Sequence, residues 1–129
     1  MPVGRNAIYW IATGLVVAAG CLSGFSYLAG TREVVEGFAH VGYPQQLRVM
    51  LGIAKAAGAV AIVAPGFPTI KEWAYAGFTF AWIAACVAHY LAGDGASALA
   101  PVALLVLLAV SYVTRPASRR WPAATRALV

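Results

Sequence analysis

Charged side chains are scarce in this sequence, and acidic ones are nearly absent. Only 10% of the 129 residues are charged, four of them Asp or Glu, whereas 62% are hydrophobic. A soluble domain is nearer about 45 to 50% apolar. The composition therefore excludes an ordinary soluble protein and predicts an integral membrane protein in a lipid bilayer. The net charge of +5 does not indicate a nucleic-acid partner, because the basic residues cluster at the chain ends and in one loop.

Recognisable metal and cofactor motifs are also lacking. The sequence has no HxxxH, HExxH or CxxC spacing, and its two histidines, His40 and His89, lie far apart, so no metal site is predicted. The absence of a phosphate-binding loop, a dinucleotide fingerprint and a nucleophile elbow argues against an enzyme with a soluble cofactor. Cys21 and Cys86 lie in apolar stretches and are predicted to be free packing residues.

What the chain does have is four long apolar runs, at about residues 8–29, 45–64, 70–91 and 98–114. At about 1.5 Å per residue, each is long enough to cross most or all of a hydrocarbon core of roughly 30 Å. The fold class predicted is an all-α membrane protein, an antiparallel four-transmembrane-helix bundle formed as a single domain over residues 1–129. A basic tail covers residues 115–129. A secretory signal peptide is the rival interpretation of the first run, although the run continues past Cys21 without a break.

Residues 30–46 hold the densest cluster of ionisable groups. Glu33, Glu36 and His40 are spaced i, i+3, i+7, which places them on one face of a short interfacial helix between spans 1 and 2. Arginines and lysines are more numerous on the side of the two termini than on the side of this helix. Both termini are therefore predicted to be cytoplasmic, with the interfacial helix facing outward.

One full charge lies near the middle of the second run. A charge at the bilayer centre costs about 2.5 to 3.5 kcal/mol on insertion scales, so Lys55 is expected to face protein or water and to mark a functional site. Helical side chains tilt toward the N-terminus of their own helix, and spans 2 and 3 run in opposite directions, so Lys55 and His89 are expected to converge. The prediction is an outward-facing polar pocket with Lys55 at its floor, His89 on its wall, and Glu33, Glu36 and His40 over it as a lid.

Three interpretations of this pocket remain open. In the first, its groups donate hydrogen bonds to a quinone or another lipophilic small molecule, with aromatic rings against the ligand. In the second, the protein is a membrane-embedded acid–base enzyme, an isomerase or hydrolase acting on a lipid-soluble molecule. In the third, Lys55 only pairs with Glu33 or Glu36 and is structural. The catalytic candidates are Lys55, His89 and Glu36, and the ligand-binding candidates are Arg48, Tyr27, Trp82, Glu33 and His40.

An ordered set of short motifs, from about Tyr9 to Pro116, resembles the DoxX-like proteins. The motifs are Tyr9-Trp10-Ile11, Gly14-Leu15, Ser23-Gly24, Tyr27-Leu28, Glu33-Val34-Val35-Glu36-Gly37-Phe38 with His40, Gly42-Tyr43-Pro44, Leu51-Gly52, Ala54-Lys55, Phe67-Pro68, Lys71-Glu72-Trp73-Ala74-Tyr75-Ala76-Gly77-Phe78 and Gly93-Asp94. The resemblance implies a four-helix protein of the bacterial cytoplasmic membrane. The namesake of the family is a subunit of a thiosulfate-oxidising, quinone-reducing complex, but no motif here carries thiosulfate chemistry. The leading prediction is an accessory subunit that binds a quinone-like ligand beside a membrane or periplasmic oxidoreductase.

Overall fold

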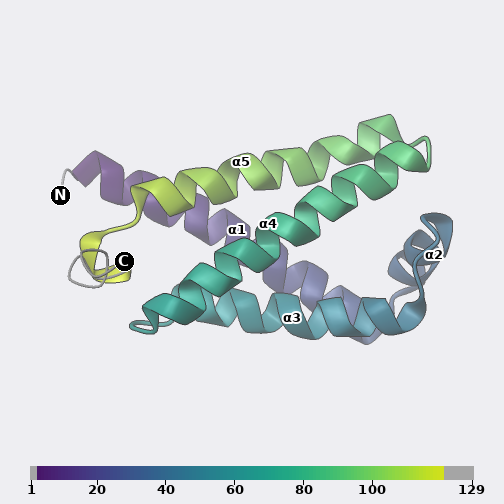
Figure 1. The fold of residues 1–129 in the computed structure, drawn as a ribbon, viewed down its shortest axis with the longest axis horizontal. Helices are drawn as coiled ribbons and strands as arrows, with labels where there is room; N and C mark the ends of the chain where they lie inside the picture. Colours follow the sequence, from purple (N-terminus) through teal and green to yellow (C-terminus); the bar gives the residue numbers. More distant parts are fainter. Residues whose placement is uncertain (1–2, 121–129) are drawn as a thin grey trace.

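The computed structural model describes residues 3–120, which form helices joined by short turns and contain no strand in that range (Figure 1). Its elements are α1 (Val3–Ala29), α2 (Arg32–His40), α3 (Gln45–Val63), α4 (Pro68–Leu91), η1 (Gly95–Ala98), α5 (Leu99–Thr114) and η2 (Ala117–Arg119). Four stretches are long and apolar enough to cross a membrane: Val3–Ala29, Gln45–Val63, Pro68–Leu91 and Gly95–Thr114. The predicted fold class is confirmed. The predicted basic tail extends to residue 129, and its part beyond residue 120 lies outside the described residues.

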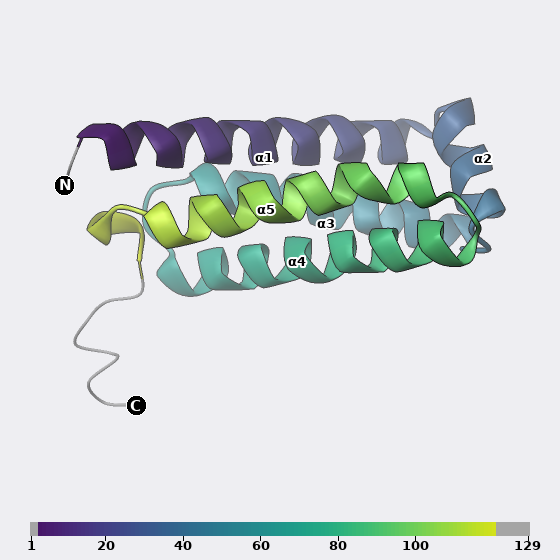
Figure 2. The same cartoon turned by 90° about the horizontal axis from the view of Figure 1, so that it is seen from above.

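The four long helices form a closed antiparallel ring. Helix α1 packs against α3 and α5, and α4 packs against the same two helices from the other side (Figures 1 and 2). We call the end that carries Val3, the α3–α4 turn and η2 the terminal end, and the end that carries α2 and residues 92–98 the α2 end. Helices α3 and α4 lie closest at the terminal end and diverge toward the α2 end, where α2 lies between them (Figure 1).

Two glycines bring α1 and α3 into close contact. A Cβ atom added at Gly24 would lie 3.1 Å from the carbonyl oxygen of Gly52, and one added at Gly52 would lie 2.9 Å from the Leu28 side chain. Small residues allow such an approach in a bilayer, where helices associate largely through van der Waals packing. Lys55 lies on α3 one turn after Gly52, so the close contact between α1 and α3 fixes the position of its backbone.

The core is aromatic and aliphatic, and large hydrophobic side chains also cover the outside of the bundle. Trp82 is 4% exposed and stacks on Phe78 with 5.0 Å between ring centroids, whereas Phe25 is 72% exposed and Phe80 is 73% exposed. Apolar side chains on an outward-facing surface are what a hydrocarbon environment favours. The buried core cluster consists of Val16, Ala59, Ile62, Tyr75, Phe78, Trp82 and Leu108.

Candidate functional site

A cavity of about 630 Å³, which we call the α2-end cavity, lies where α3 and α4 diverge. Lys55 and His89, the two side chains predicted to converge, both line it, together with Tyr27 from α1. Helix α2 covers it with apolar residues, because Val34 and Phe38 line the cavity. The other lining residues are Gly37, Val41, Tyr43, Leu47, Leu51, Gly77, Phe80, Ala81, Ala84, Ala85 and Ala88.

Lys55 is the lysine in the lining of this cavity. Helix α3 begins at the α2 end, so the tilt of its side chains directs Lys55 toward that end. The side chain is only 7% exposed, and its Nζ lies 4.0 Å from the centroid of the Tyr27 ring. The ring face attracts a cation, and this contact holds the Lys55 chain in place.

No hydrogen-bond acceptor meets the Lys55 amine within residues 3–120. In the same residues, every fully buried side-chain nitrogen or oxygen atom has a partner, so the Lys55 Nζ is not sealed in the protein but reaches the cavity. A buried amine without an acceptor is costly in a low-dielectric site. The described part of the chain therefore leaves one strong donor directed at a cavity.

The four acidic residues of the chain lie elsewhere. Glu36 pairs with Arg32 at 2.8 Å on the exposed face of α2, and Glu33 is exposed on the same helix. Glu72 pairs with Arg115 at 2.9 Å near the terminal end, and Asp94 contacts the two histidines. The structure thus brings neither Glu33 nor Glu36 to Lys55, and the side of α2 that covers the cavity is its apolar one.

Asp94 links α2 to the end of α4. Its Oδ2 accepts hydrogen bonds from Nε2 of His40 at 2.8 Å and from Nδ1 of His89 at 3.2 Å. The hydrogen bond from His89 and that from His40 lower the pKa of Asp94, although partial burial opposes them. Because a carboxylate only accepts, Nδ1 of His89 carries the proton, and Nε2 of a neutral His89 ring is left as an acceptor.

Arg48 and Trp82, which were also predicted to bind the ligand, lie outside the α2-end cavity. The Arg48 guanidinium donates to the backbone carbonyl of Tyr27 and, at 2.8 Å, to Oε1 of Gln45, so it caps the last turn of α1. Trp82 faces the core and stacks on Phe78. Neither side chain is among those that line the α2-end cavity.

The terminal end holds a second buried lysine, Lys71, which is 1% exposed. Its Nζ donates to the carbonyl oxygen of Ala61 at 2.7 Å and to that of Ala64. Arg119 donates to the carbonyl oxygens of Ile62 and Val63, both at 3.0 Å. Two cations thus meet four consecutive carbonyl groups at the C-terminus of α3, where a helix otherwise leaves them without partners.

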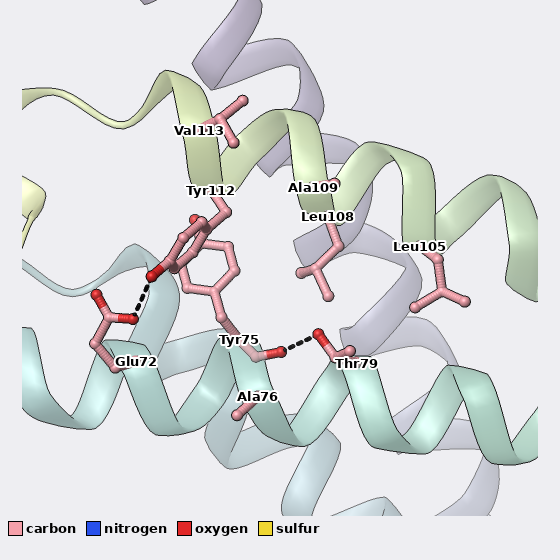
Figure 3. Close-up of a pocket in the computed structure, with 9 residues that line it drawn as sticks. All are labelled: Glu72, Tyr75, Ala76, Thr79, Leu105, Leu108, Ala109, Tyr112 and Val113. Atoms are coloured by element: carbon pink, nitrogen blue, oxygen red, sulfur yellow. Dashed lines mark hydrogen bonds between the residues drawn. The ribbon is translucent and has the colours of Figure 1, made fainter.

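A partly buried ion pair joins α4 to the end of α5. Arg115 is 3% exposed, donates to Oε1 of Glu72 at 2.9 Å, and lies over the Tyr112 ring at 3.9 Å. The hydroxyl of Tyr112 donates to the other Glu72 oxygen at 2.9 Å (Figure 3). Glu72 and Tyr112 line an α4–α5 crevice of about 370 Å³ (Figure 3). Its other two hydroxyl groups are also bonded, Thr79 to the Tyr75 carbonyl and Tyr75 to the Ser111 hydroxyl.

The sequence patterns assign no site role to Asp94, Lys71 or Arg115. Gly93 has a φ of +83°, and the Asp94 amide donates to the His89 carbonyl at 2.8 Å. This glycine-ended cap folds the chain back so that Asp94 reaches His89. A glycine just past the C-cap of a helix and directly before an aspartate is the signal that identifies this contact.

Fold and composition define a multi-pass helical membrane protein. A model of the DoxX-like family matches residues 11–111, which is most of the chain. The chain belongs to the DoxX-like family. Neither the curated proteins nor the solved structures contain a match to it.

Proposed function

We propose that this protein binds a lipophilic redox ligand of the quinone type in the α2-end cavity. The observation that carries the proposal is the buried Lys55 amine, which reaches the cavity and has no acceptor within the described residues. A ligand carbonyl oxygen would supply that acceptor. Burial of an apolar ring in the same step would offset the cost of keeping the amine out of water.

The size and lining of the cavity support such a ligand. Its volume of about 630 Å³ falls inside the range of about 300 to 1,000 Å³ that small-molecule sites occupy. Lys55 donates to a carbonyl oxygen of the oxidised ligand, and the free ring nitrogen of His89 accepts from a hydroxyl of its reduced form, so the pair matches the two redox states of a quinone-type ring. Tyr27, Phe38 and Tyr43 supply aromatic walls.

An accessory role suits the site better than acid–base catalysis. The predicted acid–base chemistry needs Lys55, His89 and Glu36 together within reach of the substrate. Glu36, the carboxylate predicted for that role, pairs with Arg32 at the exposed surface. We therefore favour binding, with electron transfer assigned to a neighbouring membrane or periplasmic oxidoreductase.

We also propose that the protein lies in the bacterial cytoplasmic membrane with both termini in the cytoplasm. The distribution of basic residues supports this orientation, because cytoplasmic ends of membrane helices are richer in arginine and lysine. Arg5, Lys71, Arg115, Arg119 and Arg120 lie toward the terminal end, whereas Arg32 and Arg48 lie toward the α2 end.

The test is mass spectrometry of the small molecules that remain bound to the purified protein, compared with Lys55→Met and His89→Ala. Losing one charged hydrogen bond lowers affinity by about tenfold to a hundredfold. We expect a quinone in the wild type, little in Lys55→Met and a reduced amount in His89→Ala. Equal amounts in all three proteins would show that the binding site lies elsewhere. Turnover of a lipid-soluble substrate by the isolated protein, abolished in Lys55→Met, would replace this proposal with the enzymatic one.

A further inference from the structure

A second cavity of about 280 Å³, which we call the α3–α4 crevice, lies directly beside the first. Leu51, Lys55, Gly77 and Ala81 line both. The two spaces therefore meet at Lys55, and the crevice continues from there along α3 and α4 toward the terminal end.

The chemistry of the two spaces differs. The α2-end cavity has Tyr27, Tyr43 and His89 in its lining as well as Lys55. In the crevice, Lys55 is the sole ionisable residue of the lining, and small apolar residues such as Ala57, Gly58 and Ala61 form most of the rest. A polar ring suits the first space, and a hydrocarbon chain suits the second.

The length of the combined site also fits a molecule with a chain. Its lining on α4 runs from Ile70 to His89. At the helical rise of about 1.5 Å per residue this is about 28 Å, close to the roughly 30 Å of a hydrocarbon core. A ring alone occupies only a fraction of that length.

The passage between the two spaces opens to the outside of the bundle. Gly77 is exposed, and a Cβ atom added there would meet no other atom within 4 Å. Trp73 and Phe80, at the two flanks of the passage, are 71% and 73% exposed. A chain can thus enter sideways from the lipid without threading through the covered α2 end.

We infer that the ligand is a tailed lipid, whose carbonyl-bearing head occupies the α2-end cavity and whose single hydrocarbon chain lies in the α3–α4 crevice. This inference rests on the proposed binding of a quinone-like head at Lys55. It specifies the ligand class further, because chainless aromatic molecules are excluded as the natural occupant.

The experiment measures dissociation constants of two probes for the full-length protein in lipid nanodiscs. The probes share one head group: decylubiquinone carries a chain, and the corresponding dimethoxy-methyl-benzoquinone does not. A Cβ atom at Gly77 meets no neighbour, and a leucine side chain there would extend into the passage, so Gly77→Leu is the main variant and Ala81→Leu the second. Gly14→Leu is the matched control, because Gly14 is an exposed glycine of α1, equally open around its Cα and outside both cavities.

We expect the wild-type preference for the tailed probe to fall by about tenfold in Gly77→Leu and to stay unchanged in Gly14→Leu. Because each preference is a ratio measured in the same lipid, partition of the chain into the bilayer cancels between variants. Binding of the chainless probe is expected to remain sensitive to Lys55→Met in every background.

Separate outcomes overturn the two proposals. A preference that survives in both Gly77→Leu and Ala81→Leu, or that falls equally in Gly14→Leu, places the chain outside the crevice and overturns the inference alone. Binding of the chainless probe that does not respond to Lys55→Met overturns the proposed function, and the inference with it.

Discussion

The two buried lysines of this protein are treated in opposite ways. At the terminal end, Lys71 donates to the carbonyl oxygens of Ala61 and Ala64 and so completes the end of α3. Midway along the same helix, Lys55 has the face of the Tyr27 ring beside it and no acceptor among the described residues. The hydrogen bonds of Lys71 stabilise the fold, whereas an amine without an acceptor, such as that of Lys55, adds nothing to stability. This difference is the reason why we propose a stabilising role for the terminal end and a ligand-binding role for the α2-end cavity.

The largest loss of unfolding free energy is expected when the ion pair between Arg115 and Glu72 at the terminal end is broken. Arg115→Met leaves the Glu72 carboxylate without its buried partner and removes the cation from the Tyr112 ring. Glu72 is 25% exposed and keeps the Tyr112 hydroxyl, so we expect a loss at the lower end of the about 3 to 5 kcal/mol that breaking a buried pair costs. Unfolding in detergent, titrated with a denaturing surfactant, measures this loss. An unchanged midpoint would mean that the pair contributes nothing to the bundle.

The next effect concerns the structural lysine itself. Lys71→Met is expected to destabilise the protein by about 2 kcal/mol, because the Ala61 and Ala64 carbonyls lose their charged donor. The same unfolding titration measures it. Ile70→Met is the matched control, because Ile70 is an exposed neighbour on the same helix and donates no such hydrogen bond. Equal losses of unfolding free energy in the two variants would show that the hydrogen bonds of Lys71 do not stabilise the terminal end.

The smallest effect is expected at Asp94, which holds α2 to the end of α4. The substitution Asp94→Asn keeps an acceptor but loses the charge, so the amides of α2 should exchange their hydrogens a few-fold faster at neutral pH. The folded state lowers the pKa of Asp94 below its ordinary value of 3.8. Its contribution is therefore complete above that pH and is lost as the pH falls through the lowered pKa. Hydrogen exchange of both proteins across this range should show the difference disappear in acid, and a difference that grows in acid would contradict the assignment.

Most of the fold follows from the sequence, because four apolar runs separated by glycine and proline turns permit few arrangements in a bilayer. The convergence of Lys55 and His89 on one cavity also follows, since side-chain tilt depends only on the direction of each helix. The sequence does not predict how each helix is rotated about its own axis, and this rotation decides which of its side chains face the core or the cavity. Trp82 faces the core and α2 turns Phe38 rather than Glu36 inward, because packing between helices sets those rotations.

Contacts at the helix ends were the other part that sequence patterns did not reveal. Lys71 reaches the carbonyls of α3 only because the short turn after Val63 returns the chain beside that helix. Arg48 likewise caps α1 because α2 and its following turn place the start of α3 there. Such contacts depend on loop geometry, which composition and periodicity do not encode.

The unfolding free energy of ligand-free Lys55→Met, measured beside that of the ligand-free wild type, decides whether Lys55 is a ligand-binding or a structural residue. The substitution keeps most of the side-chain volume and removes an amine that lacks an acceptor, so we predict that Lys55→Met is as stable as the wild type or more stable. If Lys55→Met instead lowers the unfolding free energy by about 2 kcal/mol, as expected for Lys71→Met, then Lys55 is a structural residue and the proposed binding role is wrong.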